Sequence, residues 1–498
     1  MAIEPIFLLS HVHNGVKFRA ETRAEITYTE DIMPANRSPN EPRQGRDGLK
    51  EIFEAPARVL EEGIEVAEGA EKTLLSKRPL KLAKEYWSTL GPGFTSGAAD
   101  DDPSGIATYS QAGARYGFQL IWLTLFTYPF MSVAQEMCAR IGLVSGEGLA
   151  ANIRRHYPTS ALYGVTALLF AANVLNIAAD LGAMAASTQL LLPGIRLELF
   201  VVAFALISLL LQIFTTYASY ARYLKYLALA LLSYVAVALS LHLDWGEVLR
   251  HTLVPSITFS RDQIFLICAI LGTTISPYLF FWQTSQEVEE GILRGEKTVK
   301  ERRLDTSTRT VRRMRIDVWS GMFFSNLIAF FIFAACAGTL YASGVTNIVT
   351  ADQAAAALAP FGQFASLLFA LGIVGTGLLA VPILAGSSAY AIAESMHWKY
   401  GLYRKLKQAY AFYGVIIVAM VIGVIANFLH MDPIRGLIWA AVANGLIAPI
   451  VLFFVVRLSA SKRVMGEYAN HPLISGVGWA TIGVMGLSGV AAIATLLW

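Results

Sequence analysis

The sequence predicts an all-α polytopic membrane protein with eleven transmembrane helices, and three observations lead to this prediction. The chain has 498 residues, of which 55% are hydrophobic and 15% are charged, and this balance is too apolar for an ordinary soluble domain of that length. After residue 85 the apolar residues gather in eleven segments of roughly 20 residues or more, the length that crosses a bilayer. Two of these segments, the first and the sixth, are interrupted by proline and glycine.

Residues 1–85 differ in composition and predict an N-terminal extension, which leaves 86–498 as the transmembrane domain. The stretch 32–48 is charged and rich in proline and asparagine, whereas 49–75 has apolar residues at roughly helical spacing. Two interpretations of the second stretch stay open. It is either an amphipathic helix on the membrane or cytoplasmic surface, or part of a loosely ordered tail.

The distribution of Lys and Arg predicts the orientation of the spans, because these residues accumulate in cytoplasmic loops. With the N-terminus inside, most of the 39 Lys and Arg fall on the cytoplasmic side, including the basic run 293–315. We therefore expect a plasma (inner) membrane protein with a cytoplasmic N-terminus and an outside C-terminus. The predicted spans are 88–113, 118–142, 160–190, 197–217, 222–242, 263–286, 316–342, 361–394, 408–429, 434–457 and 473–497.

The two interrupted spans lie five apart, so each opens one half of a repeated arrangement. The first contains Pro103 and Gly105, and the sixth contains Gly272 and Pro277. A proline frees a backbone carbonyl that hydrocarbon cannot satisfy, so such breaks persist only where they line a polar site. Matching broken helices in two halves are typical of transporters with a five-plus-five inverted repeat of the LeuT type, in which the substrate binds near the membrane midplane.

Three consecutive aspartates, Asp100, Asp101 and Asp102, stand directly before Pro103 in the first interrupted span. A charge at that depth costs at least ~2.5–3.5 kcal/mol, so we expect a bound cation to oppose it. The alternative is that the first span begins later and the aspartates lie in a loop. The apolar, aromatic stretch 84–99 favours a first half-helix before them.

The chain after residue 85 resembles the NRAMP divalent-metal transporters, on the residues "GPGF" at 91–94, "QAGARYGFQLIWL" at 111–123 and "CARIGLVSGEGLA" at 138–150. The resemblance implies that a first-span Asp-Pro-Gly-Asn motif and a sixth-span Met-Pro-His motif hold a transition metal. Here the motifs read Asp102-Pro103-Ser104-Gly105 and Ser276-Pro277-Tyr278. The aspartate is kept, whereas the Asn, Met and His of the family are replaced.

These replacements predict a site with oxygen ligands only, because the soft thioether that favours transition metals is gone. Magnesium and manganese prefer oxygen, and magnesium keeps several waters, so a pocket enlarged by the lost side chains suits a partly hydrated ion. The chain is accordingly most similar to the NRAMP-related magnesium transporters. Ordinary variation within a manganese transporter is the alternative. The residues expected to hold the ion are Ala99, Asp102, Ser104, Gly105, Thr273 and Ser276.

Weak or absent proton coupling is also expected. The resemblance implies that proton-coupled members use the sixth-span His and a third-span Asp-x-x-Glu, and this chain has Tyr278 and Ala183 at those places. All eight histidines fall outside the predicted spans or at their ends, and histidine is the side chain that titrates near neutral pH. Asp180 remains from the third-span motif, either as a protonatable group or as a carboxylate that positions its helix.

Further polar residues are predicted around the site or along the ion pathway. Gln283 and Glu287 share a helix face after the sixth-span break and either line the cytoplasmic exit or hold water near the site. For Glu287, a position at a helix end is an equal alternative. Asn444 is a candidate near the site, with helix packing as the favoured role. Asp101 and Tyr278 complete this second group.

Other function classes fit the sequence less well. A sodium-coupled organic-solute symporter of this fold would need a neutral first break that exposes amides to a substrate carboxylate. An enzyme is not expected, because the spans lack a metal-ligating His cluster, a nucleophile elbow or a Cys-His pair. No repeated filter motif suggests a channel. We expect no cofactor and no nucleic-acid partner, with Mg²⁺ or Mn²⁺ as transported substrate, the lipid bilayer as surroundings, and the oligomeric state left open.

Overall fold

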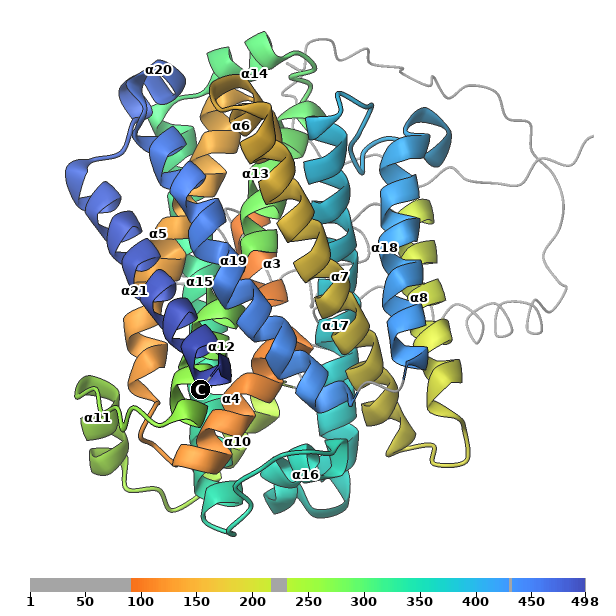
Figure 1. The fold of residues 1–498 in the computed structure, drawn as a ribbon, viewed down its shortest axis with the longest axis vertical. Helices are drawn as coiled ribbons and strands as arrows, with labels where there is room; N and C mark the ends of the chain where they lie inside the picture. Colours follow the sequence, from red (N-terminus) through yellow and green to blue (C-terminus); the bar gives the residue numbers. More distant parts are fainter. Residues whose placement is uncertain (1–90, 216–230, 430–431, 498) are drawn as a thin grey trace, which may run out of the picture. The chain divides into compact units, whose positions relative to one another are not determined.

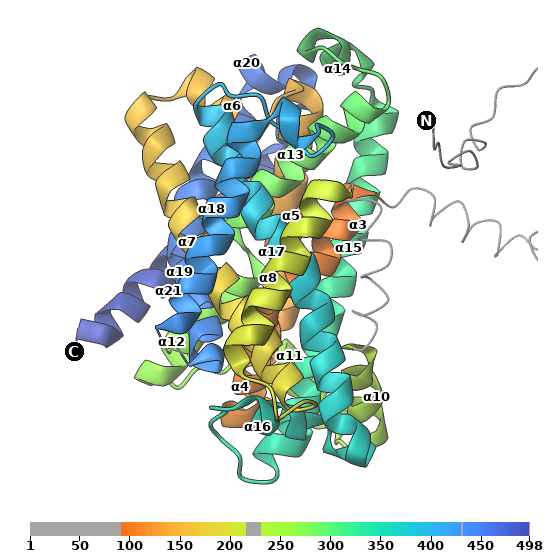
Figure 2. The same cartoon turned by 90° about the vertical axis from the view of Figure 1, so that its right-hand side faces the viewer.

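The computed structural model describes residues 91–215, 231–429 and 432–497, and within these ranges every regular element is a helix (Figures 1 and 2). The N-terminal extension and part of the fifth predicted span lie outside the described residues. The long helices and helix halves are α3 (Pro92–Asp100), α4 (Pro103–Tyr116), α5 (Trp122–Ser145), α7 (Thr159–Gln189), α8 (Leu197–Phe214), α10 (Leu232–Ser240), α12 (Arg261–Thr274), α13 (Pro277–Leu293), α15 (Thr308–Cys336), α17 (Ala365–Ser395), α18 (Tyr410–Phe428), α19 (Pro433–Ala460) and α21 (Pro472–Leu497).

Shorter helices, which are not among the predicted spans, join or extend these elements. A π-helical turn, η2, extends α15, and the 3₁₀ stretch η3 leads into α17. The short elements are α6 (Leu149–His156), α11 (Trp245–Leu253), α14 (Val299–Asp305), η2 (Ala337–Tyr341), α16 (Ala351–Ala355), η3 (Ala356–Phe364), η4 (Leu406–Gln408), α20 (Lys462–Met465) and η5 (Gly466–Tyr468). Helices α6, α14 and α20 lie at the upper end in Figures 1 and 2, and α11 and α16 at the lower end.

The predicted all-helical membrane architecture is confirmed by the length and composition of the helices. In the described ranges, eight helices are long and apolar enough to cross a membrane. Three predicted spans are not among these eight. They are the first, which the break divides into the short halves α3 and α4, the second, which α5 covers, and the fifth, of which part lies outside the described residues. The count of eleven spans therefore stays a prediction.

Glycines allow both broken helices to pack closely against a neighbour. A β-carbon added at Gly97 of α3 would overlap the backbone of Gly321 in α15. One added at Gly272 of α12 would overlap the backbone of Ala441 and Gly445 in α19. Close backbone approach of this kind is how membrane helices gain packing energy. Each break is thus held against an unbroken helix, α15 for the first and α19 for the second.

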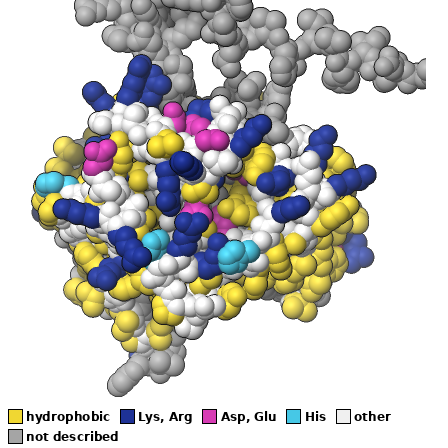
Figure 3. All heavy atoms as spheres, turned by 90° about the horizontal axis from the view of Figure 1, so that it is seen from above, with side chains coloured by type: hydrophobic (Ala, Val, Ile, Leu, Met, Phe, Trp, Pro, Cys, Tyr) yellow, Lys and Arg dark blue, Asp and Glu magenta, His cyan; other side chains and the backbone are white. Residues whose placement is uncertain are grey.

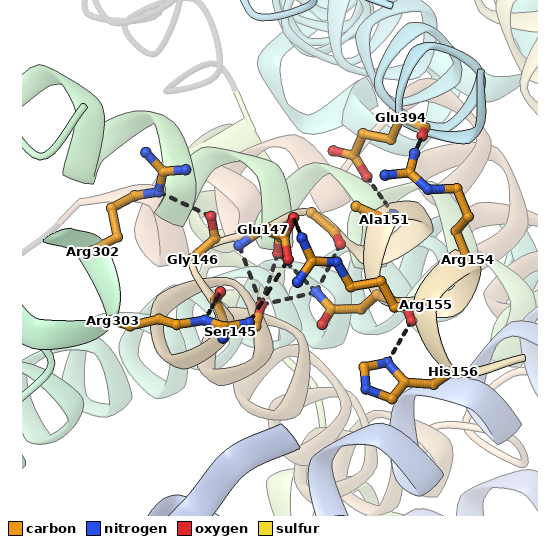
Figure 4. A network of polar contacts seen from close by, with 12 residues as sticks. Ser145, Gly146, Glu147, Ala151, Arg154, Arg155, His156, Arg302, Arg303 and Glu394 are labelled. Atoms are coloured by element: carbon orange, nitrogen blue, oxygen red, sulfur yellow. Dashed lines mark hydrogen bonds and ion pairs between the residues drawn. The ribbon is translucent and has the colours of Figure 1, made fainter. Parts of the chain in front are cut away.

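The upper end of the bundle carries much of the basic charge. Figure 3 looks onto this end and shows Lys and Arg side chains spread over it, with acidic side chains between them. Figure 4 shows how α14 is fixed there. Arg302 donates to the Gly146 carbonyl at 2.9 Å, and Arg303 donates to the Ser145 carbonyl at 2.8 Å. These bonds hold the connection between α13 and α15 against the end of α5.

Candidate metal site

The first helix break lies at Asp101 and Asp102, as the sequence predicts. Helix α3 ends at Asp100, Asp101 leaves the helical region with φ −79° and ψ 52°, and Asp102 is extended with φ −69° and ψ 170°. Helix α4 then starts at Pro103, whose missing N–H is harmless at a helix start. The Asp102 carboxylate caps this helix, because its Oδ1 accepts the Gly105 amide at 2.8 Å and the Ser104 hydroxyl at 2.6 Å.

The second break has the same outline but carries no charge. Helix α12 ends at Thr274, Ile275 and Ser276 are non-helical, and α13 starts at Pro277. The Ser276 hydroxyl does not cap α13. It turns back and donates to the carbonyls of Gly272 at 3.1 Å and Thr273 at 2.8 Å.

Side chains from the two breaks meet around Tyr278. Its hydroxyl donates to Asp102 Oδ2 at 3.3 Å and lies 3.4 Å from the Ala99 carbonyl oxygen. The Ala99 carbonyl oxygen and Asp102 Oδ2, which are both expected to hold the ion, therefore lie within hydrogen-bond distance of the same hydroxyl. Beside them the Ser104 and Thr273 hydroxyls are 3.3 Å apart, and the hydroxyls of Tyr109 and Thr274 are 2.8 Å apart.

The space that the missing Asn side chain was expected to leave at Gly105 is filled. A β-carbon added there would lie 3.2 Å from the Thr273 hydroxyl oxygen and 3.4 Å from the Tyr109 ring. The expected enlargement of the pocket is thus absent beside Gly105 in this conformation. Of the six residues expected to hold the ion, Asp102, Ala99, Ser104, Gly105 and Thr273 lie together, while the Ser276 hydroxyl bonds within its own helix connection.

Within the described ranges, the acidic groups near the break lack a basic partner. Asp102 is 1% exposed, and the ion pairs among the described residues include none of Asp100, Asp101, Asp102 or Asp180. Over the same residues, no group of three or more His, Cys, Asp and Glu is arranged to hold a metal. A cation at Asp102 would therefore be held by one carboxylate together with hydroxyl, carbonyl and water oxygens.

The other two aspartates face a different helix. The Ser325 hydroxyl of α15 lies 3.2 Å from Asp100 Oδ2 and 3.2 Å from Asp101 Oδ1. Sequence reasoning missed Ser325, because a serine in an apolar span gives no signal of its partner. Asp180 of α7 is fully buried, and among the described residues neither of its carboxylate oxygens has a hydrogen-bond partner.

A chain of polar contacts leads from the break toward the basic end. The Ser96 hydroxyl, one turn before Asp100, donates to Gln283 at 2.6 Å, and Gln283 donates to Glu287 at 3.0 Å. Glu287 lines a cavity of about 650 Å³ at that end. The acidic and basic side chains around this cavity are Glu287, Glu290, Arg294, Asp305, Arg309, Arg313 and Asp317.

The remaining predicted residues are Asn444 and the histidines. Asn444 of α19 exchanges hydrogen bonds with Asn176 of α7, at 3.1 and 3.4 Å, so it joins these two helices one turn before Asp180. The histidines of the described ranges lie in short helices or connections, as predicted. They are His156, His242, His251, His397 and His471.

The sequence of this chain is similar to those of known transport proteins. The chain is 25% identical to the "Divalent metal cation transporter MntH" of Klebsiella pneumoniae subsp. pneumoniae over 84% of this chain and 96% of that one. It is 26% identical to the protein of the same name from Aeromonas hydrophila subsp. hydrophila, over 85% and 98%.

Solved structures show the same fold. A crystal structure of the Eremococcus coleocola manganese transporter, in complex with an aromatic bis-isothiourea substituted compound, matches with a TM-score of 0.67 at 17% identity, over 82% of this chain and 86% of that one. The family described as Natural resistance-associated macrophage protein-like matches residues 93–495, which is most of the chain. This integral membrane protein therefore belongs to the Nramp family.

Proposed function

We propose that this protein is a secondary transporter that moves divalent metal cations, Mg²⁺ and Mn²⁺, across the membrane. The observation that carries the proposal is the buried Asp102 carboxylate at the meeting point of two helix breaks, with the Ala99 carbonyl and the Tyr278 hydroxyl beside it. The relatives named as divalent metal cation transporters support it, and transport is not an enzymatic function.

The preference for hard ions follows from the donor atoms around Asp102. Ser104 and Thr273 offer hydroxyl oxygens, and Ser276 stands where the family motif has a thioether. Oxygen ligands suit magnesium and manganese, whereas sulfur favours softer transition metals. Magnesium gives up its water reluctantly, so it would bind with part of its hydration shell.

Weak or absent proton coupling is the second part of the proposal, with the membrane potential driving cation entry. The described long helices contain no histidine, and Tyr278 and Ala183 replace the acid-base residues of the motif. A proton-coupled manganese or iron transporter is the alternative function. The observation that favours it is Asp180, whose buried carboxylate has no hydrogen-bond partner in the described ranges and is suited to carrying a proton.

The orientation rests on the basic end seen in Figure 3. Because Lys and Arg gather on the cytoplasmic side, we assign this end to the cytoplasm of a cell bounded by a plasma (inner) membrane. The N-terminus is then inside and the C-terminus outside. The cavity of about 650 Å³ opens toward the cytoplasm in this arrangement, and Ser96, Gln283 and Glu287 form the polar path between it and the break.

Uptake by purified protein in proteoliposomes tests the proposal. Under an inside-negative potential, Mn²⁺ should enter, millimolar Mg²⁺ should compete, and an enclosed pH-sensitive dye should report no metal-dependent acidification. Asp102→Ala should abolish uptake. Asp432→Ala is the matched control, because Asp432 also caps a helix before a proline, at the start of α19. Uptake by Asp102→Ala at the wild-type rate would contradict the site, and metal-dependent acidification would favour the proton-coupled alternative.

A further inference from the structure

The three aspartates of the first break do not face the same space. Asp102 turns toward Tyr278 of α13 and the start of α4. Asp100 and Asp101 turn toward α15, where the Ser325 hydroxyl reaches both carboxylates at 3.2 Å. The break therefore has two acidic sides, and the proposed transport site uses only one of them.

The α15 side of the break holds more negative charge than its surroundings satisfy. Asp100 is 3% exposed and Asp101 is 5% exposed, so water does little to stabilise their charges. Ser325 has one hydroxyl hydrogen for two carboxylates. Asp100 Oδ1 is buried and has no hydrogen-bond partner within the described part of the chain. The ion pairs of the described residues leave both carboxylates without Lys or Arg.

Two neighbouring buried carboxylates without a compensating positive charge are strongly destabilising when both are ionised. A single divalent cation would neutralise the two negative charges of Asp100 and Asp101. Carboxylate and hydroxyl oxygens are hard donors that suit Mg²⁺ and Mn²⁺. Asp102 and Asp180 are also buried, and the ion pairs of the described residues include neither of them.

We infer that Asp100, Asp101 and Ser325 bind a second hard divalent cation on the α15 side of the break, separate from the ion at Asp102. The inference rests on the proposed function for the kind of ion, because both sites draw on the same substrate. The second ion neutralises the carboxylates next to the transport site and joins α3 to α15. Its binding is set by residues that the transport site does not use.

Counting bound ions tests the inference. The full-length protein in detergent is equilibrated with saturating Mn²⁺, bound metal is counted by equilibrium dialysis, and the electron paramagnetic resonance spectrum is recorded. We expect about two ions per chain in the wild type, with spectral broadening because two Mn²⁺ ions at one break are close enough to interact magnetically. Asp100→Asn and Asp101→Asn should each leave about one ion and an unbroadened spectrum.

Two further variants complete the experiment. Ser325→Ala, a milder change, should weaken the second ion by about tenfold through loss of one ligand. Ser320→Ala is its control, because Ser320 lies on the same helix and donates only to the Ile316 carbonyl, at 2.6 Å. The control should bind as the wild type does.

The outcomes separate this inference from the proposed function. Asp102→Ala should bind about one ion per chain, the one on the α15 side of the break, and should show no metal uptake. One ion in the wild type that Asp102→Ala removes would overturn the second site and keep the transport site. Unchanged binding in Asp102→Ala would instead overturn the transport site.

Discussion

The two helix breaks share one design but differ in charge. Each ends a half-helix, passes through two non-helical residues and restarts at a proline, Pro103 or Pro277. The first break carries three carboxylates, whereas the second carries only the Ser276 hydroxyl between its two halves. The Asp102 side chain faces across to Tyr278, while the Ser276 hydroxyl returns to its own half-helix α12.

This difference separates two tasks that one binding site must perform. The first break supplies the charge that draws a cation out of water, since an isolated carboxylate in hydrocarbon is costly. The second break determines the shape of the binding site and the chemical character of its lining, because its residues are neutral and their hydroxyls are already hydrogen bonded. We therefore expect substitutions at the first break to change affinity and substitutions at the second to change which ion is preferred.

Asp102→Asn should have the largest effect. Asn also caps helices well, so the start of α4 should persist while the charge is lost. A carboxylate within about 4 Å of a cation contributes several kcal/mol even at an effective dielectric constant near 20, so Mn²⁺ affinity should fall by at least about 100-fold. Calorimetric titration of the purified variant measures this.

Asp432→Asn is the control for that variant, since Asp432 caps α19 by accepting the amides of Ile434 and Arg435. It should bind Mn²⁺ like the wild type. Retention of wild-type affinity by Asp102→Asn would remove the contrast between the breaks, because charge at the first break would then be dispensable.

Both breaks were predictable from the sequence, because proline and glycine inside apolar segments are local signals. Pro103 and Pro277 each begin the second half of a broken helix, as expected. The meeting of Asp102 with residues near Pro277 was expected from the repeat and the family resemblance. These predictions depend on the residue types within a short stretch of chain and on the architecture that such breaks imply.

Contacts between distant helices were not predictable in the same way. The approach of Ser325 to Asp100 and Asp101 depends on how α3 rotates against α15, which Gly97 and Gly321 permit by close packing. The direction of the Ser276 hydroxyl depends on which carbonyls the end of α12 leaves free. Side-chain direction and helix rotation are properties of the packed bundle, and one sequence does not encode them in a readable pattern.

Ser276→Met should have the next largest effect and should change selectivity. A thioether at this position adds a soft ligand, so preference should move toward cadmium and iron relative to magnesium by roughly tenfold. Competition of each metal against radioactive Mn²⁺ in proteoliposomes measures the change. Ser276→Leu has a similar size without sulfur and should not show it.

The same experiment tests the role of Gly105. Adding Gly105→Asn to Ser276→Met restores both family ligands, and Thr273 must then move, because it already lies 3.2 Å from an added β-carbon. We expect the double variant to favour soft metals and to transport magnesium less well. Equal selectivity in the wild type, the Met variant and the Leu variant would mean that the second break does not set ion preference.

Tyr278→Phe should have a moderate effect on stability and a small one on transport. The hydroxyl lies within hydrogen-bond distance of the Ala99 carbonyl and of Asp102. Its loss leaves buried acceptors unsatisfied, which should lower the free energy of unfolding of the ion-free protein by about 1–3 kcal/mol. Thermal unfolding without metal should therefore occur at lower temperature, and added Mg²⁺ should restore more stability than in the wild type.

Tyr109→Phe is the matched control for the tyrosine. Its hydroxyl contacts Thr274 and not an aspartate, so metal should not compensate its loss. An equal response of both variants to Mg²⁺ would show that a bound ion does not interact with the oxygen atoms that the Tyr278 hydroxyl contacts.

Ser276→Ala should have the smallest effect, although the sequence places Ser276 among the residues that hold the ion. Its hydroxyl already donates to the Gly272 and Thr273 carbonyls, so its removal should cost about 1 kcal/mol of stability at the end of α12. Mn²⁺ and Mg²⁺ uptake should change by about twofold or less, because water can supply one oxygen to a partly hydrated ion. Initial uptake rates over a range of metal concentrations measure both ions. A loss comparable to that of Asp102→Asn would make Ser276 a direct ligand and would end the division of tasks between the two breaks.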